Sequence, residues 1–208
     1  MSSRTTEMLD FSAERAGALP CAGVDEAGRG PWAGPVVAAA VVLDPGRLPQ
    51  GLGDSKKLTA ARRVSLFEVL GACAEIGVGR AEVDEIDSLG ILRANDLAMR
   101  RALAALPLAP ARVLIDGNRV PPQLGFPAEA IVRGDGAVAS IAAASIIAKV
   151  TRDRIMAEHA IEFPQYGWER NAGYGTAAHR AALAQHGVTP LHRRSFAPIH
   201  KMLCEGST

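Results

Sequence analysis

The chain has 208 residues, of which 48% are hydrophobic and 4% aromatic, and its 23 Lys and Arg face 22 Asp and Glu. This length allows one well-buried core, and the longest wholly apolar run, Val36 to Leu43, is too short to span a bilayer. The net charge of +1 argues neither for nor against nucleic acid. If nucleic acid is the partner, the basic residues must be segregated on one surface.

The cysteines and the first residues indicate a compartment. Cys21, Cys73 and Cys204 are odd in number and widely spaced, which is typical of a reduced protein rather than a disulfide scaffold. Met1 to Thr5 leads into no apolar segment, so we expect no secretory signal. The expectation is a cytoplasmic protein without membrane association. The sequence does not determine the oligomeric state, and a monomer is the default expectation.

The first half of the chain predicts three strands and two helices. In chain order they are strands at 19–24 and 36–43, a helix from Thr59 to about 74, a strand at 76–83 and a helix at 88–106. Because few residues separate the first two strands, we expect them to pair antiparallel.

The second half predicts two more strands and then helices. Short strands at 113–116 and 129–132 precede a long helix at about 137–160, a glycine-rich loop at 166–175, a helix at about 176–186 and a basic tail. This order favours an α/β fold, with a mixed sheet flanked by helices and a helical C-terminal part.

One stretch places two adjacent carboxylates beside a glycine-rich turn. Asp25 and Glu26 follow the first apolar strand, and Gly28-Arg29-Gly30 comes directly after them. Neighbouring side chains of a strand point to opposite faces, so both acids can serve one site only where the strand ends and the chain bends. Gly28 and Gly30 permit that bend.

Two further acids extend the pattern. Asp116 ends a buried strand and Asp135 precedes the long helix, although alone they are explained as a turn residue and a helix cap. Together, carboxylates at strand ends repel one another unless a cation intervenes. Carboxylate oxygens without Cys or His ligands suit Mg²⁺ or Mn²⁺, and two such ions can hydrolyse a phosphodiester.

The stretch Asp25 to Pro31 resembles the signature of ribonuclease HII, the type 2 ribonuclease H of bacteria. The resemblance continues, in matching order, through 54–58, 114–118, 134–135, 141–153, 163–167, 173–174 and 192–196. It implies a ribonuclease H-like core at 18–160, preceded by an N-terminal extension at 1–17. A helical segment at 161–208 would pack on that core and contribute to substrate binding.

The resemblance also implies an activity and a metal site. The expected enzyme cuts the RNA strand of RNA–DNA hybrids and cuts 5′ of a single ribonucleotide in duplex DNA, leaving 3′-hydroxyl and 5′-phosphate ends. The family's four metal-binding and catalytic acids fall on Asp25, Glu26, Asp116 and Asp135. Two divalent ions, Mg²⁺ or Mn²⁺, are implied as cofactors.

The same resemblance assigns substrate contacts. The backbone of Gly28-Arg29-Gly30 is expected to read the 2′-hydroxyl, and Tyr174 to pack against the next deoxyribose. Gly175 stands where some family members have proline, which makes the placement of Tyr174 less firm. Phosphate contacts are expected from Ser55, Lys56 and Lys57, and more weakly from Arg193 and Arg194.

Three other functions stay open at this point. A dinucleotide-binding loop is disfavoured because G-x-G-x-x-G is absent and Asp25-Glu26 would repel phosphates. A different nuclease of the same fold, such as a junction resolvase, would leave a duplex with one ribonucleotide intact. A nonenzymatic hybrid-binding protein would bind without cutting. The five histidines show no metal-ligand spacing and are assigned no chemistry.

Overall fold

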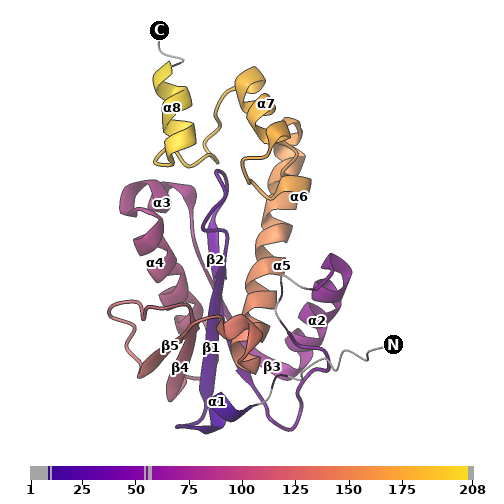
Figure 1. The fold of residues 1–208 in the computed structure, drawn as a ribbon, viewed down its shortest axis with the longest axis vertical. Helices are drawn as coiled ribbons and strands as arrows, with labels where there is room; N and C mark the ends of the chain where they lie inside the picture. Colours follow the sequence, from indigo (N-terminus) through magenta and orange to yellow (C-terminus); the bar gives the residue numbers. More distant parts are fainter. Residues whose placement is uncertain (1–8, 10, 54, 56–57, 206–208) are drawn as a thin grey trace.

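The computed structural model describes residues 9, 11–53, 55 and 58–205, and its centre is a five-stranded sheet with helices on both faces (Figure 1). In chain order the elements are α1 (Ser12–Arg15), β1 (Cys21–Ala27), β2 (Val36–Leu43), α2 (Ala60–Cys73), β3 (Ala74–Ala81), α3 (Val83–Leu89), α4 (Ile91–Ala104), β4 (Arg112–Asp116), β5 (Ala128–Ile131), the 3₁₀ turn η1 (Gly134–Gly136), α5 (Ala139–Glu162), η2 (Pro164–Tyr166), α6 (Trp168–Asn171), α7 (Ala177–His186) and α8 (Ala197–Glu205).

The sheet has the strand order β3-β2-β1-β4-β5, so β1 lies in the middle. Strands β1, β2 and β3 pair antiparallel, which confirms the predicted pairing of the first two strands. Strands β4 and β5 continue the sheet in parallel with β1. The predicted mixed α/β fold is therefore confirmed.

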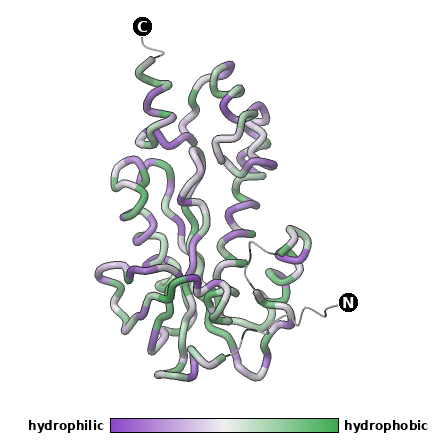
Figure 2. The backbone as a smooth tube through the Cα atoms, viewed as in Figure 1, coloured by the Kyte–Doolittle hydropathy of each residue, from purple (hydrophilic) through white to green (hydrophobic). Residues whose placement is uncertain are grey.

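Each face of the sheet has its own apolar core. On one face, Val24, Ala38 and Ile115 pack with residues of α4 such as Ala98 and Ala102. On the other, side chains of β2 such as Ala39 and Val41 pack with α2 and α5. The hydrophobic stretches of the chain coincide with these buried elements in Figure 2.

Helix α5 lies unusually close to the central strand. A Cβ atom built on Gly23 of β1 would lie 2.2 Å from the carbonyl carbon of Ser140, so only glycine allows this approach. At the same end, the buried Glu14 of α1 accepts a hydrogen bond from the Ser140 amide at 2.8 Å. The carboxylate thereby satisfies one of the amides left without a partner in the first turn of α5.

The C-terminal part of the chain forms a third core beyond the far end of α5 (Figure 1). Tyr166, Trp168, Leu183 and Ile199 are buried there around the end of the helix. The connection between β1 and β2 is attached to this part, because the Trp32 amide donates to the Gly173 carbonyl at 2.8 Å. The same connection therefore contacts both the sheet and the C-terminal helices.

Several predicted boundaries need correction. The helix expected at 88–106 is interrupted at Gly90, which adopts φ = 78°, so α4 covers most of it and a separate helix, α3, precedes the glycine from Val83 onward. Strand β1 is longer than predicted and includes Asp25, Glu26 and Ala27. Strand β3 follows α2 without a loop. Over the described ranges of the chain, the structure contains no helix long and apolar enough to cross a membrane.

Candidate active site

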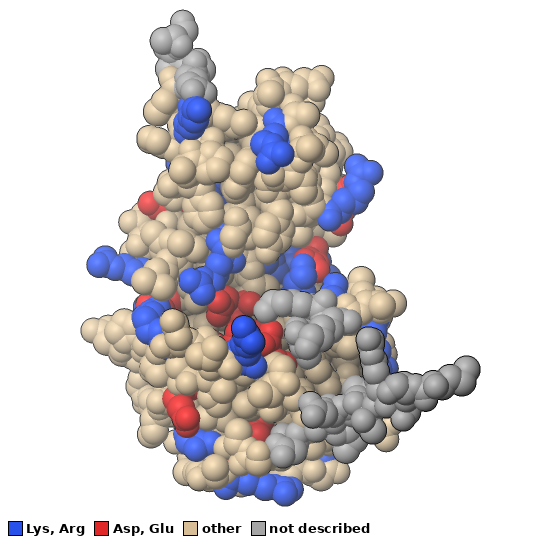
Figure 3. Space-filling view, in the orientation of Figure 1, with Lys and Arg blue, Asp and Glu red and all other residues tan. Residues whose placement is uncertain are grey.

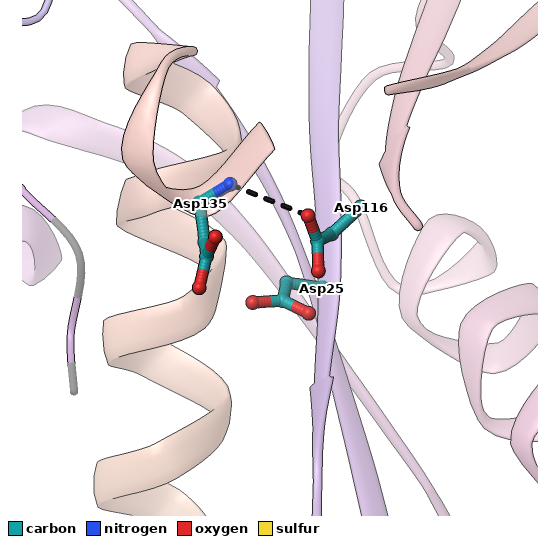
Figure 4. Close-up of side chains that lie close together, drawn as sticks. All are labelled: Asp25, Asp116 and Asp135. Atoms are coloured by element: carbon teal, nitrogen blue, oxygen red, sulfur yellow. Dashed lines mark hydrogen bonds between the residues drawn. The ribbon is translucent and has the colours of Figure 1, made fainter. Parts of the chain in front are cut away.

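Three carboxylates meet beside the middle of the sheet. Asp25, Asp116 and Asp135 each place one carboxylate oxygen so that these oxygens lie within 4.8 Å of one another (Figure 4). Asp25 comes from β1, Asp116 ends β4, and Asp135 lies in η1 just before α5. The Asp135 amide donates to Oδ1 of Asp116 at 3.4 Å. The sequence prediction that these three acids come together is consistent with this geometry.

The register of the parallel pair explains the meeting of the first two acids. Val24 of β1 lies opposite Ile115 of β4, and both face the α4 core. Because side chains alternate between faces, the following residues, Asp25 and Asp116, both face α5. The turn before α5 then brings Asp135 against them.

The electrostatics of this cluster favour a cation. Asp25 is 5% exposed, and its pKa lies well above the usual value, first because of burial and then because of the negative charges of Glu26 and Asp116. A hydrogen bond from the Ser145 hydroxyl acts in the opposite direction. Oxygen-only donors of this kind fit Mg²⁺ or Mn²⁺, and such an ion would remove the repulsion.

Glu26 reaches the same cleft from the other face of β1. Its Oε1 accepts from Nη1 of Arg29 at 3.1 Å, and it lies outside the three-carboxylate group. Burial raises its pKa, while the hydrogen bond and charge of Arg29 lower it. Asp25 and Glu26 thus share one cleft from inside the strand, and not at a bend after its end as the sequence suggested.

The cleft has a volume of about 400 Å³ and also contains the glycine-rich turn and Tyr174. Gly28 adopts φ = 96°, and a Cβ atom on it would lie 2.0 Å from Nε of Arg152, so this position requires glycine. A Cβ atom on Gly30 would lie 3.5 Å from Cε1 of Tyr174. Tyr174 is 49% exposed and therefore available to a ligand beside the turn.

The loop after Tyr174 is closely packed. A Cβ atom on Gly175 would lie 2.2 Å from Cζ2 of Trp32, so glycine lets the indole pack directly against the backbone. The carbonyl of Tyr174 accepts from the Thr176 amide at 2.8 Å and contacts Nδ1 of His179 at 3.0 Å. These contacts hold the tyrosine backbone even though proline is absent from position 175.

The predicted phosphate-binding residues have different outcomes. Lys56 and Lys57 lie outside the described residues. Ser55 is buried at the edge of the cleft, where its Oγ is 2.6 Å from Oγ of Ser145.

Figure 3 shows acidic side chains in the middle of one face of the molecule, with basic side chains on either side of them. Further basic side chains lie at the top and the bottom of the same face, so on this face they are not confined to the surroundings of the acids.

The comparison with protein families matches the Ribonuclease HII model to residues 22–199. The chain belongs to the ribonuclease HII family. The ribonuclease HII of Ruegeria pomeroyi is 59% identical over 205 residues, which cover 97% of this chain and 88% of that protein. The ribonuclease HII of Paracoccus denitrificans is 59% identical over 200 residues, covering 96% and 95%. Membership of this family makes the chain an endoribonuclease.

Solved structures show the same ribonuclease H-like fold. Ribonuclease H2 from Pyrococcus horikoshii is 27% identical, with a TM-score of 0.77 over 90% of this chain and 99% of that one. The RNase HII of the PCNA complex from Archaeoglobus fulgidus is 29% identical, with a TM-score of 0.71 over 83% and 93%. Bst-RNase HIII in complex with Mn²⁺ is 20% identical, with a TM-score of 0.72 over 98% and 76%, which shows the shared fold alone.

The sequence analysis of this ribonuclease HII family member missed one face of α5. Ser145, Lys149 and Arg152 line the cleft and are spaced four and three residues apart. That spacing places them on one side of a helix and could have identified them. Arg63, from α2, also lines the cleft and donates to the carbonyls of Ser55 and Leu58 at 2.9 and 2.7 Å.

The expectation that Arg193 contacts phosphate is wrong. The side chain is fully buried, and its guanidinium donates to main-chain carbonyl oxygens. Its neighbour Arg194 is exposed, and its amide donates to Oδ2 of Asp87 at 2.9 Å. Only Arg194 of this pair stays a candidate for phosphate contact.

Proposed function

We propose that this protein hydrolyses the RNA strand of RNA–DNA hybrids and cuts on the 5′ side of single ribonucleotides in duplex DNA, leaving 3′-hydroxyl and 5′-phosphate ends. The observation that carries this proposal is one cleft lined by Asp25, Glu26 and Asp116, by the Gly28–Gly30 turn and by Tyr174, with Asp135 against the two aspartates. The family membership of the chain supports the reaction class, and the arrangement of these residues supports the substrate.

The acids are proposed as the metal ligands and the catalytic residues. Asp25, Asp116 and Asp135, with Glu26 across the strand, would hold two Mg²⁺ or Mn²⁺ ions, and Asp25 is the best placed to bridge them. Such ions lower the pKa of a bound water and stabilise the leaving oxygen of a phosphodiester. The chain itself holds its carboxylates in a fixed group, since Asp25 accepts hydrogen bonds from the Glu26 amide and the Ser145 hydroxyl.

Sugar selection is proposed for the turn and the tyrosine. The 2′-hydroxyl distinguishes ribose from deoxyribose by donating and accepting hydrogen bonds. The backbone at Gly28, Arg29 and Gly30 is open to such contact because two of the three residues lack side chains. Tyr174 lies directly beside Gly30, and its flat ring would pack against the neighbouring sugar. Ser55, Lys56 and Lys57 are proposed to bind phosphate near the same cleft.

The division of the chain follows from these roles. Residues 18–160 would form the catalytic core, and residues 161–208 would supply Tyr174 and cover one side of the substrate, with 1–17 as an N-terminal extension. Cys21, Cys73 and Cys204 are all free thiols, which supports a cytoplasmic location. The proposed enzyme acts as a monomer.

The decisive experiment uses matched duplexes that contain one ribonucleotide, a run of ribonucleotides or none, each in Mg²⁺ and in Mn²⁺. We expect cleavage of the first two, with the cut on the 5′ side of the single ribonucleotide, and no cleavage of the third. Binding without any cut would favour a hybrid-binding protein. Cleavage of branched DNA with an intact single-ribonucleotide duplex would favour a resolvase. Either result overturns the proposal.

A further inference from the structure

Two arginines are buried under the proposed ribose-reading turn. Arg152 is 1% and Arg193 is 0% exposed, and neither forms an ion pair with a carboxylate of the described residues. Burial lowers the pKa of Arg152 to about 10 and that of Arg193 to about 9. Both guanidinium groups therefore keep their charge at neutral pH. Burying a charge is costly unless hydrogen bonds compensate for the lost water.

The compensation comes from the main chain of the turn. Arg193 donates from Nη2 to the Gly28 carbonyl at 2.6 Å and from Nη1 to the Arg29 and Pro31 carbonyls at 3.0 and 2.9 Å. Its Nε donates to the Gly34 carbonyl at 2.9 Å. Since residues 28–35 lie outside the strands, these carbonyls have no ladder partner, and one planar guanidinium satisfies four of them.

Arg152 binds other carbonyls of the connection between β1 and β2, and not those of Gly28 and Arg29. It donates to the carbonyls of Ala33 and Pro35 at 3.1 and 3.0 Å and to that of Ala172 at 2.9 Å. Ala172 stands two residues before Tyr174. Arg193 is therefore the residue that fixes the peptide planes at the start of the turn, while Arg152 joins the end of the turn to the tyrosine loop.

The direction of these peptide planes has a chemical consequence. In a trans peptide unit the carbonyl and the following amide point in opposite directions. The carbonyls of Gly28 and Arg29 point to the buried Arg193, so the amides of Arg29 and Gly30 point away from it. Both residues line the cleft, and neither amide donates to any other described residue.

We propose that Arg193 is a positioning residue for ribose recognition. It turns the amides of Arg29 and Gly30 into the cleft as a fixed pair of donors for the 2′-hydroxyl oxygen of the substrate. This inference rests on the proposed function and adds the group that orients the reading backbone. Lysine cannot replace arginine here, because a single ammonium group lacks the planar set of donors that holds four carbonyls.

The test compares Arg193→Lys with Arg112→Lys, since Arg112 also donates to a main-chain carbonyl, that of Ala13, at the other end of β4. Affinity for a duplex with one ribonucleotide and for the same duplex without it is measured in Ca²⁺ as a non-catalytic probe ion. We expect Arg193→Lys to reduce the preference for the ribonucleotide by roughly tenfold or more, the value of one to two hydrogen bonds. Calorimetric binding of Mn²⁺ to the acidic cluster should be unchanged.

The outcomes separate this inference from the function on which it rests. If the wild-type protein neither prefers nor cuts the ribonucleotide duplex, the proposed function fails. If the wild-type protein shows the preference and Arg193→Lys keeps it in full, only the role of Arg193 fails. A similar loss in Arg112→Lys would reduce the effect to general destabilisation and would also overturn the inference.

A second measurement keeps the proposal testable if Arg193→Lys does not fold. In the wild-type protein, the amide resonances of Arg29 and Gly30 should shift on binding the ribonucleotide duplex in Ca²⁺ and shift less with the all-DNA duplex. Equal shifts with both duplexes would show that these amides meet phosphate rather than ribose, and would contradict the inference.

Discussion

This molecule has two buried polar clusters, the acidic cluster and a histidine–tryptophan network in the C-terminal part. They differ in whether their members find hydrogen-bond partners within the cluster. In the network, Nε2 of His179 lies 3.2 Å from Nε1 of Trp168 and 3.0 Å from Nε2 of His192, and its Nδ1 faces the Tyr174 carbonyl. Nδ1 of His192 accepts from the Thr189 amide at 3.0 Å. Every ring nitrogen has a partner when both histidines are neutral.

The acidic cluster shows the opposite arrangement. Burial and the negative charges of Glu26 and Asp116 raise the pKa of Asp25, and the hydrogen bonds that Asp25 accepts offset these effects only in part. A chain gains no stability from gathering like charges in this way. The comparison teaches that buried polar groups which hydrogen-bond to one another support the structure. Buried carboxylates that repel one another instead indicate a site for an external cation.

Replacing a member of the cluster should give the largest effect of all. Asp25→Asn should lower cleavage of a ribonucleotide-containing duplex by about a thousandfold or more, since it removes a proposed metal ligand. Without metal, the variant should be at least as stable as the wild type, because a repulsive charge is gone. Single-turnover kinetics and thermal unfolding in EDTA measure the two results. Near-normal turnover would show that the cluster is not the catalytic centre.

Replacing a member of the network should change stability instead. His179→Leu leaves the ring nitrogens of Trp168 and His192 without this partner and removes one of the two hydrogen bonds to the Tyr174 carbonyl, so it should lower the free energy of unfolding by roughly 2–4 kcal/mol. Mn²⁺ binding to the acids should stay unchanged at a temperature where the variant is folded. Denaturant unfolding and calorimetry provide the measurements, and an equally stable variant would contradict the structural role of the network.

Substitutions of Gly28 and Gly30 separate a structural role from a substrate-binding role within the turn. Gly28→Ala combines φ = 96° with a contact to Arg152 and should destabilise the protein by about 1–3 kcal/mol. Gly30→Ala meets only an ordinary contact with Tyr174, so it should fold normally. Its methyl group should nevertheless weaken cleavage at a single ribonucleotide. Equal melting temperatures for both variants would disprove the packing argument.

The smallest expected effect is a pH dependence of stability, to which His192 and Asp25 contribute with opposite signs. Burial lowers the pKa of His192 to about 4, so its contribution is complete above the unfolded value of 6.5 and is lost as pH falls toward 4. The pKa of Asp25 is raised, so its contribution is complete below 3.8 and is lost as pH rises through the folded value. Melting temperatures in EDTA should show the acid-side loss in the wild type and less of it in His192→Gln.

Much of the fold could be predicted from the sequence, because its signals are local. Apolar runs and Thr59 as a helix cap gave β2 and the start of α2, and the structure confirms both. The break between α3 and α4 was missed because the helix predicted at 88–106 runs across Gly90. Local patterns identify where an element lies better than where a glycine divides it.

The candidate site was predictable only where its groups are side chains of recognisable motifs. Asp25 lies inside β1 rather than at its end, but the positions of Asp116 at a strand end and of Asp135 before the long helix do follow from the sequence. The roles of Arg152 and Arg193 do not, because their partners are main-chain carbonyl oxygens far along the chain. Every residue has such a carbonyl, so the residue types do not reveal these contacts. The histidine network is hidden for a related reason, since its residues show no regular spacing.

Helix α5 begins next to Asp135 and ends beneath the buried Trp168. At 1.5 Å per residue, its 24 residues form a continuous rod of roughly 36 Å. The C-terminal helices therefore cannot tilt relative to the acids unless this rod bends. The helix therefore fixes the separation between the acids at its start and the aromatic core at its end, and one residue added to it would turn the two ends by about 100° relative to each other.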